Sequence, residues 1–98
     1  MTVDIEKNGG EVKIRLSGKL DTKSAMKIDK EIKETLKGAD SAVLDLAELT
    51  YVSSSGLRTI LGIYKMMNGR MTIKNVRSNI MELFEITGFG SAMNIGNL

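Results

Sequence analysis

Asp45-Leu-Ala-Glu-Leu-Thr-Tyr-Val-Ser-Ser-Ser-Gly-Leu57 runs from a strand, through three consecutive serines, into a helix. The nearly continuous apolar run Ala42–Leu46 is typical of a central parallel strand covered on both faces, and Thr50–Val52 continues toward the serines. Serine hydroxyls at a helix start accept hydrogen bonds from its first free N–H groups. One serine suffices for such a cap, so Ser53–Ser55 also offers hydroxyls for modification at a helix end that tolerates an added anion.

Asp45 interrupts the apolar run, and its carboxylate has two interpretations. In the first, it lies near the serines and shapes their turn. In the second, it sits at the end of the strand and hydrogen-bonds loop backbone, which is a common role of aspartate outside helices.

The second helix of the chain is predicted from about Ser55 to Met67. Its core face is expected at Leu57, Ile60, Leu61 and Tyr64, which recur at helical spacing. Arg58, Gly62 and Met66 lie away from that face and are candidate partner contacts. A glycine inside a helix costs about 1 kcal/mol relative to alanine, so either close packing within the domain or a partner surface would account for Gly62.

The remaining segments predict a single α/β domain over residues 1–98. Alternating apolar residues on both sides of Asn8-Gly9 predict an N-terminal β-hairpin, and Asp21-Thr22 is a predicted helix N-cap. Asn79 and Glu82 fit a capping box for a third helix, and residues 91–95 are a predicted last strand. The order β-β-α-β-α-β-α-β favours a mainly parallel mixed sheet with helices packed on it.

The carboxyl ends of the parallel strands should carry the functional loops. Three loops qualify, at residues 20–24, 51–56 and 75–79. The first two are expected to share an edge of the sheet, which places Asp21 and Thr22 near the serines.

Composition excludes several functions. The chain has no His and no Cys, which removes the commonest general base and the commonest metal ligands, and its net charge of +2 is too balanced for nucleic-acid binding. No glycine precedes the serines as a nucleophile elbow requires, and no phosphate-binding glycine loop is present. We therefore expect no catalytic residue, cofactor, metal or membrane contact, and a cytoplasmic location.

The run Leu44–Leu57, followed by Ile60-Leu-Gly62, resembles the STAS domain of bacterial anti-sigma-factor antagonists. Leu16-Ser-Gly-Lys-Leu-Asp21 and Phe84-Glu-Ile-Thr-Gly88 extend the resemblance over nearly the whole chain. That family reads Asp-Ser-Ser-Gly-Leu at the turn, and its first serine is phosphorylated. On this pattern Ser54 takes the phosphorylated position, with Ser55 and Ser53 as alternatives. Ser53 stands where the family has aspartate.

The resemblance implies a switch in which the unphosphorylated protein binds an anti-sigma factor that is also a serine kinase, and so releases a sigma factor. Phosphorylation turns binding off, and a serine phosphatase restores it. The expected partner-binding residues are Asp21, Thr22, Ser53, Ser54, Ser55, Gly56, Arg58, Gly62 and Met66. The protein is expected to be a monomer or a weak dimer. The alternatives are a STAS-type accessory or scaffold subunit of a transport or signalling complex, and a domain with no phosphorylation at all.

Overall fold

The first two strands form a hairpin around Asn8-Gly9-Gly10. In the computed structural model, which describes residues 1–88 and 95–96, β1 (Thr2–Asn8) pairs antiparallel with β2 (Glu11–Leu20), and Asn8 stands opposite Glu11. Gly9 has a φ of +63°, in the left-handed region that glycine adopts without strain. The predicted hairpin is confirmed.

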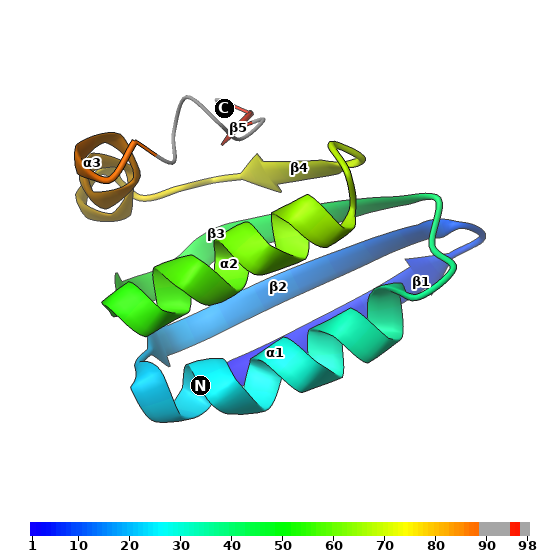
Figure 1. Cartoon of the computed structure of the whole chain (residues 1–98), viewed down its shortest axis with the longest axis horizontal. Coiled ribbons are helices and arrows are strands. Elements are labelled where there is room, and N and C mark those ends of the chain that lie inside the picture. The colour runs from blue at the N-terminus through cyan, green and yellow to red at the C-terminus, as the bar shows by residue number, and fades with distance from the viewer. Residues whose placement is uncertain (89–94, 97–98) are drawn as a thin grey trace.

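The rest of the chain alternates helices and strands. The elements after β2 are α1 (Thr22–Leu36), β3 (Ser41–Val52), α2 (Ser54–Met66), β4 (Met71–Lys74), α3 (Ser78–Ile86) and β5 (Ile95–Gly96). The strands are hydrogen-bonded in sequence order, and each pair from β2 to β5 is parallel (Figure 1). The predicted α/β fold with a mainly parallel mixed sheet is confirmed. Residues 91–94 of the predicted last strand lie outside the described residues.

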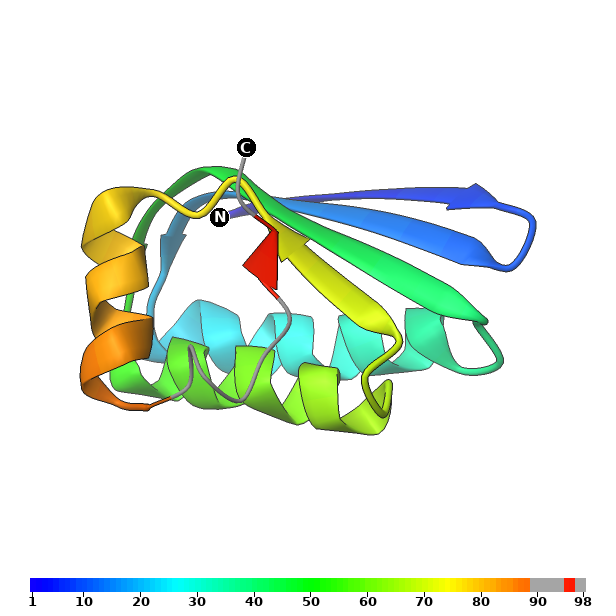
Figure 2. The same ribbon diagram turned by 90° about the horizontal axis from the view of Figure 1, so that it is seen from above.

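The helices α1 and α2 lie side by side against one face of the sheet, and α3 stands at the end where β3 leads into α2 (Figure 2). In β3, Ala42, Leu44 and Leu46 are buried, whereas Val43 and Asp45 alternate with them and are partly exposed. The expectation that this strand is covered on both faces is therefore wrong. Its apolar run packs on one side only, as the two-residue period of a strand requires.

The core lies between the sheet and these two helices. Ile14, Leu44 and Ile73 are register partners on three neighbouring strands, and none is more than 1% exposed. Ile32 of α1 and Ile60 of α2 are both 0% exposed. Burying each such side chain contributes about 1.5–3 kcal/mol. This packing fixes where β3 ends and where α2 begins.

The buried face of α2 is rotated from the predicted one. Its buried residues are Gly56, Leu57, Ile60 and Ile63. Leu61 and Tyr64, which were expected in the core, are half-buried, whereas Met67 just after the helix is 1% exposed. Helical spacing identifies the apolar stripe, but it does not say which edge of the stripe meets the sheet.

Candidate functional site

Ser53 is the N-cap of α2 and joins the helix to the sheet. Its backbone is extended, its hydroxyl accepts a 3.1 Å hydrogen bond from the N–H of Gly56, and its carbonyl accepts one of 2.9 Å from Leu57. Its own N–H donates to the carbonyl of Leu20 at 2.8 Å. The helix consequently begins at Ser54, one residue earlier than predicted. We call Ser53–Gly56 the serine turn.

Ser55 is tied to the start of α1. The hydroxyl of Thr22 donates to the hydroxyl oxygen of Ser55 at 3.4 Å, and Ser55 is half-buried. The sequence-based expectation that Thr22 lies near the serines is confirmed by this contact. It follows from the parallel pairing of β2 with β3, in which Leu20 stands opposite Val52.

Asp21 is the N-cap of α1 and faces its own helix. Its Oδ1 accepts hydrogen bonds from the N–H and the hydroxyl of Ser24, at 2.9 and 2.7 Å. The side-chain bond from Ser24, followed by the backbone bond, lowers the pKa of the Asp21 carboxyl. The predicted cap is confirmed, and Asp21 places one fixed negative charge one residue before Thr22.

Ser54 differs from both of its neighbours. It is the first residue of α2, its side chain is exposed, and its hydroxyl makes no hydrogen bond within the described part of the chain. Ser53 and Ser55 are half-buried and their hydroxyl oxygens each accept a hydrogen bond. Ser54 therefore offers an accessible hydroxyl whose modification would break no bond of the fold.

Gly56 lets the start of α2 approach the end of β2. A Cβ at this position would lie 2.7 Å from Val52 Cγ2, 2.8 Å from Leu20 Cγ and 2.9 Å from the Leu20 carbonyl oxygen. Contacts below 3.0 Å force a shift, and the Leu20 carbonyl is backbone that cannot swing away. Gly56 is thus required by packing, and it holds the serine turn against the adjoining strand.

Arg58, Gly62 and Met66 follow Ser54 along α2 at intervals of four residues. Arg58 is exposed, and Met66 is 38% exposed. Among the described residues, a Cβ on Gly62 would meet only Lys33 Nζ of α1, at an ordinary 3.7 Å. Close packing within the domain therefore does not explain Gly62. The partner-surface interpretation of these three positions stays a prediction.

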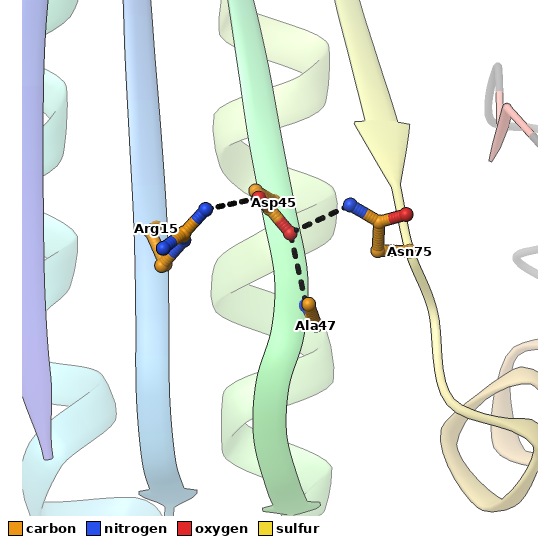
Figure 3. A network of polar contacts seen from close by, with 4 residues as sticks. All are labelled: Arg15, Asp45, Ala47 and Asn75. Atoms are coloured by element: carbon orange, nitrogen blue, oxygen red, sulfur yellow. Dashed lines mark hydrogen bonds and ion pairs between the residues drawn. The ribbon is translucent and has the colours of Figure 1, made fainter. Parts of the chain in front are cut away.

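Asp45 lies away from the serine turn, in the middle of β3 (Figure 3). Its Oδ2 accepts a 3.1 Å hydrogen bond from Arg15 on β2, and its Oδ1 accepts 3.0 Å bonds from the Asn75 amide and the Ala47 N–H. Burial would raise the pKa of this carboxyl, but the bonds from Ala47, Asn75 and Arg15 together lower it. Asp45 bonds backbone within its own strand, and we assign it a structural role.

The segment between β4 and α3 donates side-chain hydrogen bonds to β3, a role that was not predicted from the sequence. β4 pairs with β3 only as far as Asp45. Beyond that point, Arg77 Nε donates a 2.9 Å hydrogen bond to the Ala47 carbonyl. The Asn79 side-chain amide likewise donates a 3.3 Å bond to the Thr50 carbonyl. The predicted capping box at Asn79 is wrong, because Arg77 is the N-cap and Asn79 is engaged with β3. The alternation of polar residues at 75, 77 and 79 was the signal available for this contact.

Two further observations concern metal binding and membrane spans. Over residues 1–88 and 95–96, no group of three acidic side chains is placed to hold a metal ion. None of the helices described is long and apolar enough to cross a membrane. The polar groups present at the serine turn are hydroxyls and backbone amides.

Comparisons with known proteins agree with this picture. BtrV of Bordetella bronchiseptica, named as a candidate anti-sigma factor antagonist, is 31% identical over 99% of this chain and 87% of its own length. The anti-sigma-B factor antagonist of Bacillus subtilis is 27% identical over 97% of this chain and 90% of its own. The solved structure of the Bacillus cell fate determinant SpoIIAA in its phosphorylated form superposes with a TM-score of 0.76, at 25% identity, over 97% of this chain and 91% of its own.

The family model for the STAS domain matches residues 2–97, which is nearly the whole chain. The match includes both strands of the hairpin, the serine turn and the described helices. This protein belongs to the STAS domain family.

Proposed function

We propose that this protein is an anti-sigma factor antagonist that acts as a partner switch in the cytoplasm. Its unmodified form binds an anti-sigma factor that is also a serine kinase, and this binding releases a sigma factor. Family membership and relatives that are named as antagonists of anti-sigma factors support the proposal. The role is one of binding, not catalysis, and the protein works as a monomer or a weak dimer.

We further propose Ser54 as the control point of the switch. The observation that carries this assignment is its free, exposed hydroxyl between two serines whose hydroxyls are engaged in the fold. Modifying Ser53 would remove the cap of α2, and modifying Ser55 would break its contact with Thr22. A kinase can reach Ser54 at no such cost.

The reaction at Ser54 is a phosphoryl transfer in which the kinase supplies ATP and Mg²⁺. The Ser54 oxygen forms a bond to the γ-phosphorus, the bond from that phosphorus to ADP breaks, and the hydroxyl proton passes to a base on the kinase. A serine phosphatase reverses the modification by hydrolysis, which returns the serine and inorganic phosphate. This chain contributes only the accepting hydroxyl and the rigid turn that presents it.

The phosphate acts through charge. It adds about −1.5 to −2 charges at the N-terminus of α2, where the helix dipole tolerates a negative group. The fold therefore absorbs the modification, whereas a partner that buries the serine turn against apolar or acidic groups does not. A loss of about 3 kcal/mol of binding free energy weakens affinity more than a hundredfold.

A capture experiment with three baits tests the proposal. The baits are the wild type, Ser54→Asp, and Ser41→Asp as a control that adds the same charge at the opposite end of β3. We expect the wild type and Ser41→Asp to retain an anti-sigma factor with an ATP-binding serine kinase domain from lysate of the source organism, and Ser54→Asp to lose it. Retention of the same transport or signalling subunits by all three baits would overturn the proposal in favour of an accessory subunit.

A further inference from the structure

Ser54 and Arg58 lie four residues apart in α2, and both side chains are exposed. Side chains at such spacing lie above one another on the same face of a helix. Long helical side chains also lean toward the helix N-terminus, a direction in which the guanidinium of Arg58 can reach the turn that carries Ser54. The pair is therefore in reach without any movement of the backbone.

Among the contacts of residues 1–88 and 95–96, Arg58 is the one arginine without a polar partner. Arg15 pairs with Asp45, Arg70 donates to the carbonyls of Met67 and Ala39, and Arg77 donates to Ala47. Arg58 has no hydrogen bond or ion pair within the described residues. Its helical neighbours three and four positions away are Ser54, Ser55, Leu61 and Gly62. None of these neighbours is acidic, so its charge is uncompensated along the helix.

A phosphate on Ser54 would supply the missing charge. The planar guanidinium presents paired N–H donors that match two phosphate oxygens, which makes arginine a stronger phosphate partner than lysine. We propose that Arg58 is a positioning residue of the phosphorylated form, in which its guanidinium binds the phosphate of Ser54 within the same helix. This inference rests on the proposed function and adds how the modified state is held.

The consequence is a switch with two parts. In the unmodified protein, Arg58 is free to contact an acidic group of the partner. In the phosphorylated protein, the same side chain is drawn onto the phosphate, so the partner meets a new negative charge and also loses a basic contact. An aspartate at position 54 reproduces these two effects only in part. Its side chain is shorter than phosphoserine, and its carboxylate carries a single negative charge.

Other charged residues lie on the segments that adjoin the serine turn or β3. Lys19 is near the end of β2, Asp21 follows β2, and Arg77 lies in the connection between β4 and α3. Asp21 is bonded to Ser24, and Arg77 to Ala47. Arg58 is thus the nearest cation on the helix that carries the phosphate. Its removal should change the second pKa of that phosphate.

Phosphoserine installed at position 54 by genetic code expansion tests the inference without a kinase. Phosphorus NMR would follow the second ionisation of the phosphate in the otherwise wild-type chain and in Arg58→Gln, Arg58→Lys and Lys65→Gln. Lys65→Gln is the matched control, because it removes one charge from the same helix at about 16 Å from Ser54. Arg58 favours the doubly charged phosphate, so we expect Arg58→Gln to raise that pKa by about half a unit, Arg58→Lys by less, and Lys65→Gln to leave it unchanged.

Equal phosphate pKa values in the wild-type background and in Arg58→Gln would overturn the inference. So would a shift of the same size in Lys65→Gln, because that would show a general effect of net charge. Neither result depends on which partner the protein binds. The contact between Arg58 and the phosphate can therefore be absent from a protein that binds an anti-sigma factor. It can equally be present in a protein that does not bind one.

Discussion

Arg77 Nε donates a 2.9 Å hydrogen bond to the carbonyl oxygen of Ala47. β3 has one extra residue at this point, since its register with β2 shifts between the Arg15–Asp45 pair and the Ser17–Glu48 pair. Such bulges leave backbone groups without ladder partners. The Ala47 N–H is taken by Asp45 and its carbonyl by Arg77, so side chains complete the strand that leads to the serine turn.

Replacing Arg77 by alanine should lower the free energy of unfolding by about 1 kcal/mol, because its hydrogen bond to the Ala47 carbonyl is lost. Urea denaturation followed by circular dichroism measures the effect. Arg58→Ala is the control, since Arg58 is equally a surface arginine and has no bond to lose among the described residues, and it should stay within about 0.5 kcal/mol of the wild type. Equal losses in the two variants would contradict the role given to Arg77.

Asp45 should make stability depend on acid pH. The hydrogen bonds from Ala47, Asn75 and Arg15 outweigh burial and hold the pKa of this carboxyl below its usual value in the folded protein. Its contribution to stability is therefore complete above the unfolded-state pKa and is lost as pH falls through the folded-state pKa. Asp45→Asn should cost about 2 kcal/mol near neutral pH, because charged hydrogen bonds are lost. The difference in unfolding free energy between the two proteins should shrink below about pH 4. If that difference in unfolding free energy stayed constant down to about pH 2, Asp45 would not be the source of the pH dependence.

The two glycines of α2 should respond oppositely to alanine. Gly56→Ala should destabilise the fold by about 1–3 kcal/mol, because the new methyl group meets the Leu20 carbonyl at 2.9 Å. Gly62→Ala should stabilise it by about 1 kcal/mol, because a helical glycine is replaced where Lys33 Nζ is the one atom of the described residues within 4 Å of the new methyl group. Thermal unfolding of both variants checks this, and a destabilising Gly62→Ala would contradict the open surroundings assigned to Gly62.

Alanine substitutions at Ser53 and Ser54 should differ in their effect on the free energy of unfolding. Ser53→Ala removes the N-cap of α2 and should cost about 1 kcal/mol of unfolding free energy. Ser54→Ala removes a hydroxyl that bonds nothing within the described residues, so it should be close to neutral in the same urea titration. If Ser54→Ala were the more damaging change, Ser54 would be a structural residue and a poor candidate for the switch.

Much of the fold follows from sequence patterns that act locally. Asn8-Gly9 sets the hairpin, Asp21 caps α1, and the strand–helix alternation sets the parallel sheet. The proximity of Thr22 and Ser55 could also be predicted, because the ends of adjacent parallel strands meet at one edge. These features depend on turn chemistry and on the order of elements, and both can be read from the sequence.

The features that escaped prediction depend on tertiary geometry. Nothing in the sequence says that β3 is open on one face, because Val43 is as apolar as its buried neighbours Ala42 and Leu44. Asn79 fits a capping pattern in the sequence, but in the structure its side-chain amide donates to the Thr50 carbonyl instead. Bulges in β3 leave such carbonyls available for hydrogen bonds from side chains. The distinction between Ser54 and its neighbours likewise required the hydrogen bonds of Ser53 and Ser55.

A phosphate on Ser54 should turn off binding to an anti-sigma factor. Isothermal titration calorimetry measures this effect with the purified anti-sigma factor that the wild-type bait retains. That factor is titrated with this protein, either unmodified or carrying phosphoserine at position 54. We expect Kd to rise at least about a hundredfold on phosphorylation, which corresponds to about 3 kcal/mol. Values of Kd that agree within about twofold, well under 1 kcal/mol, would contradict it.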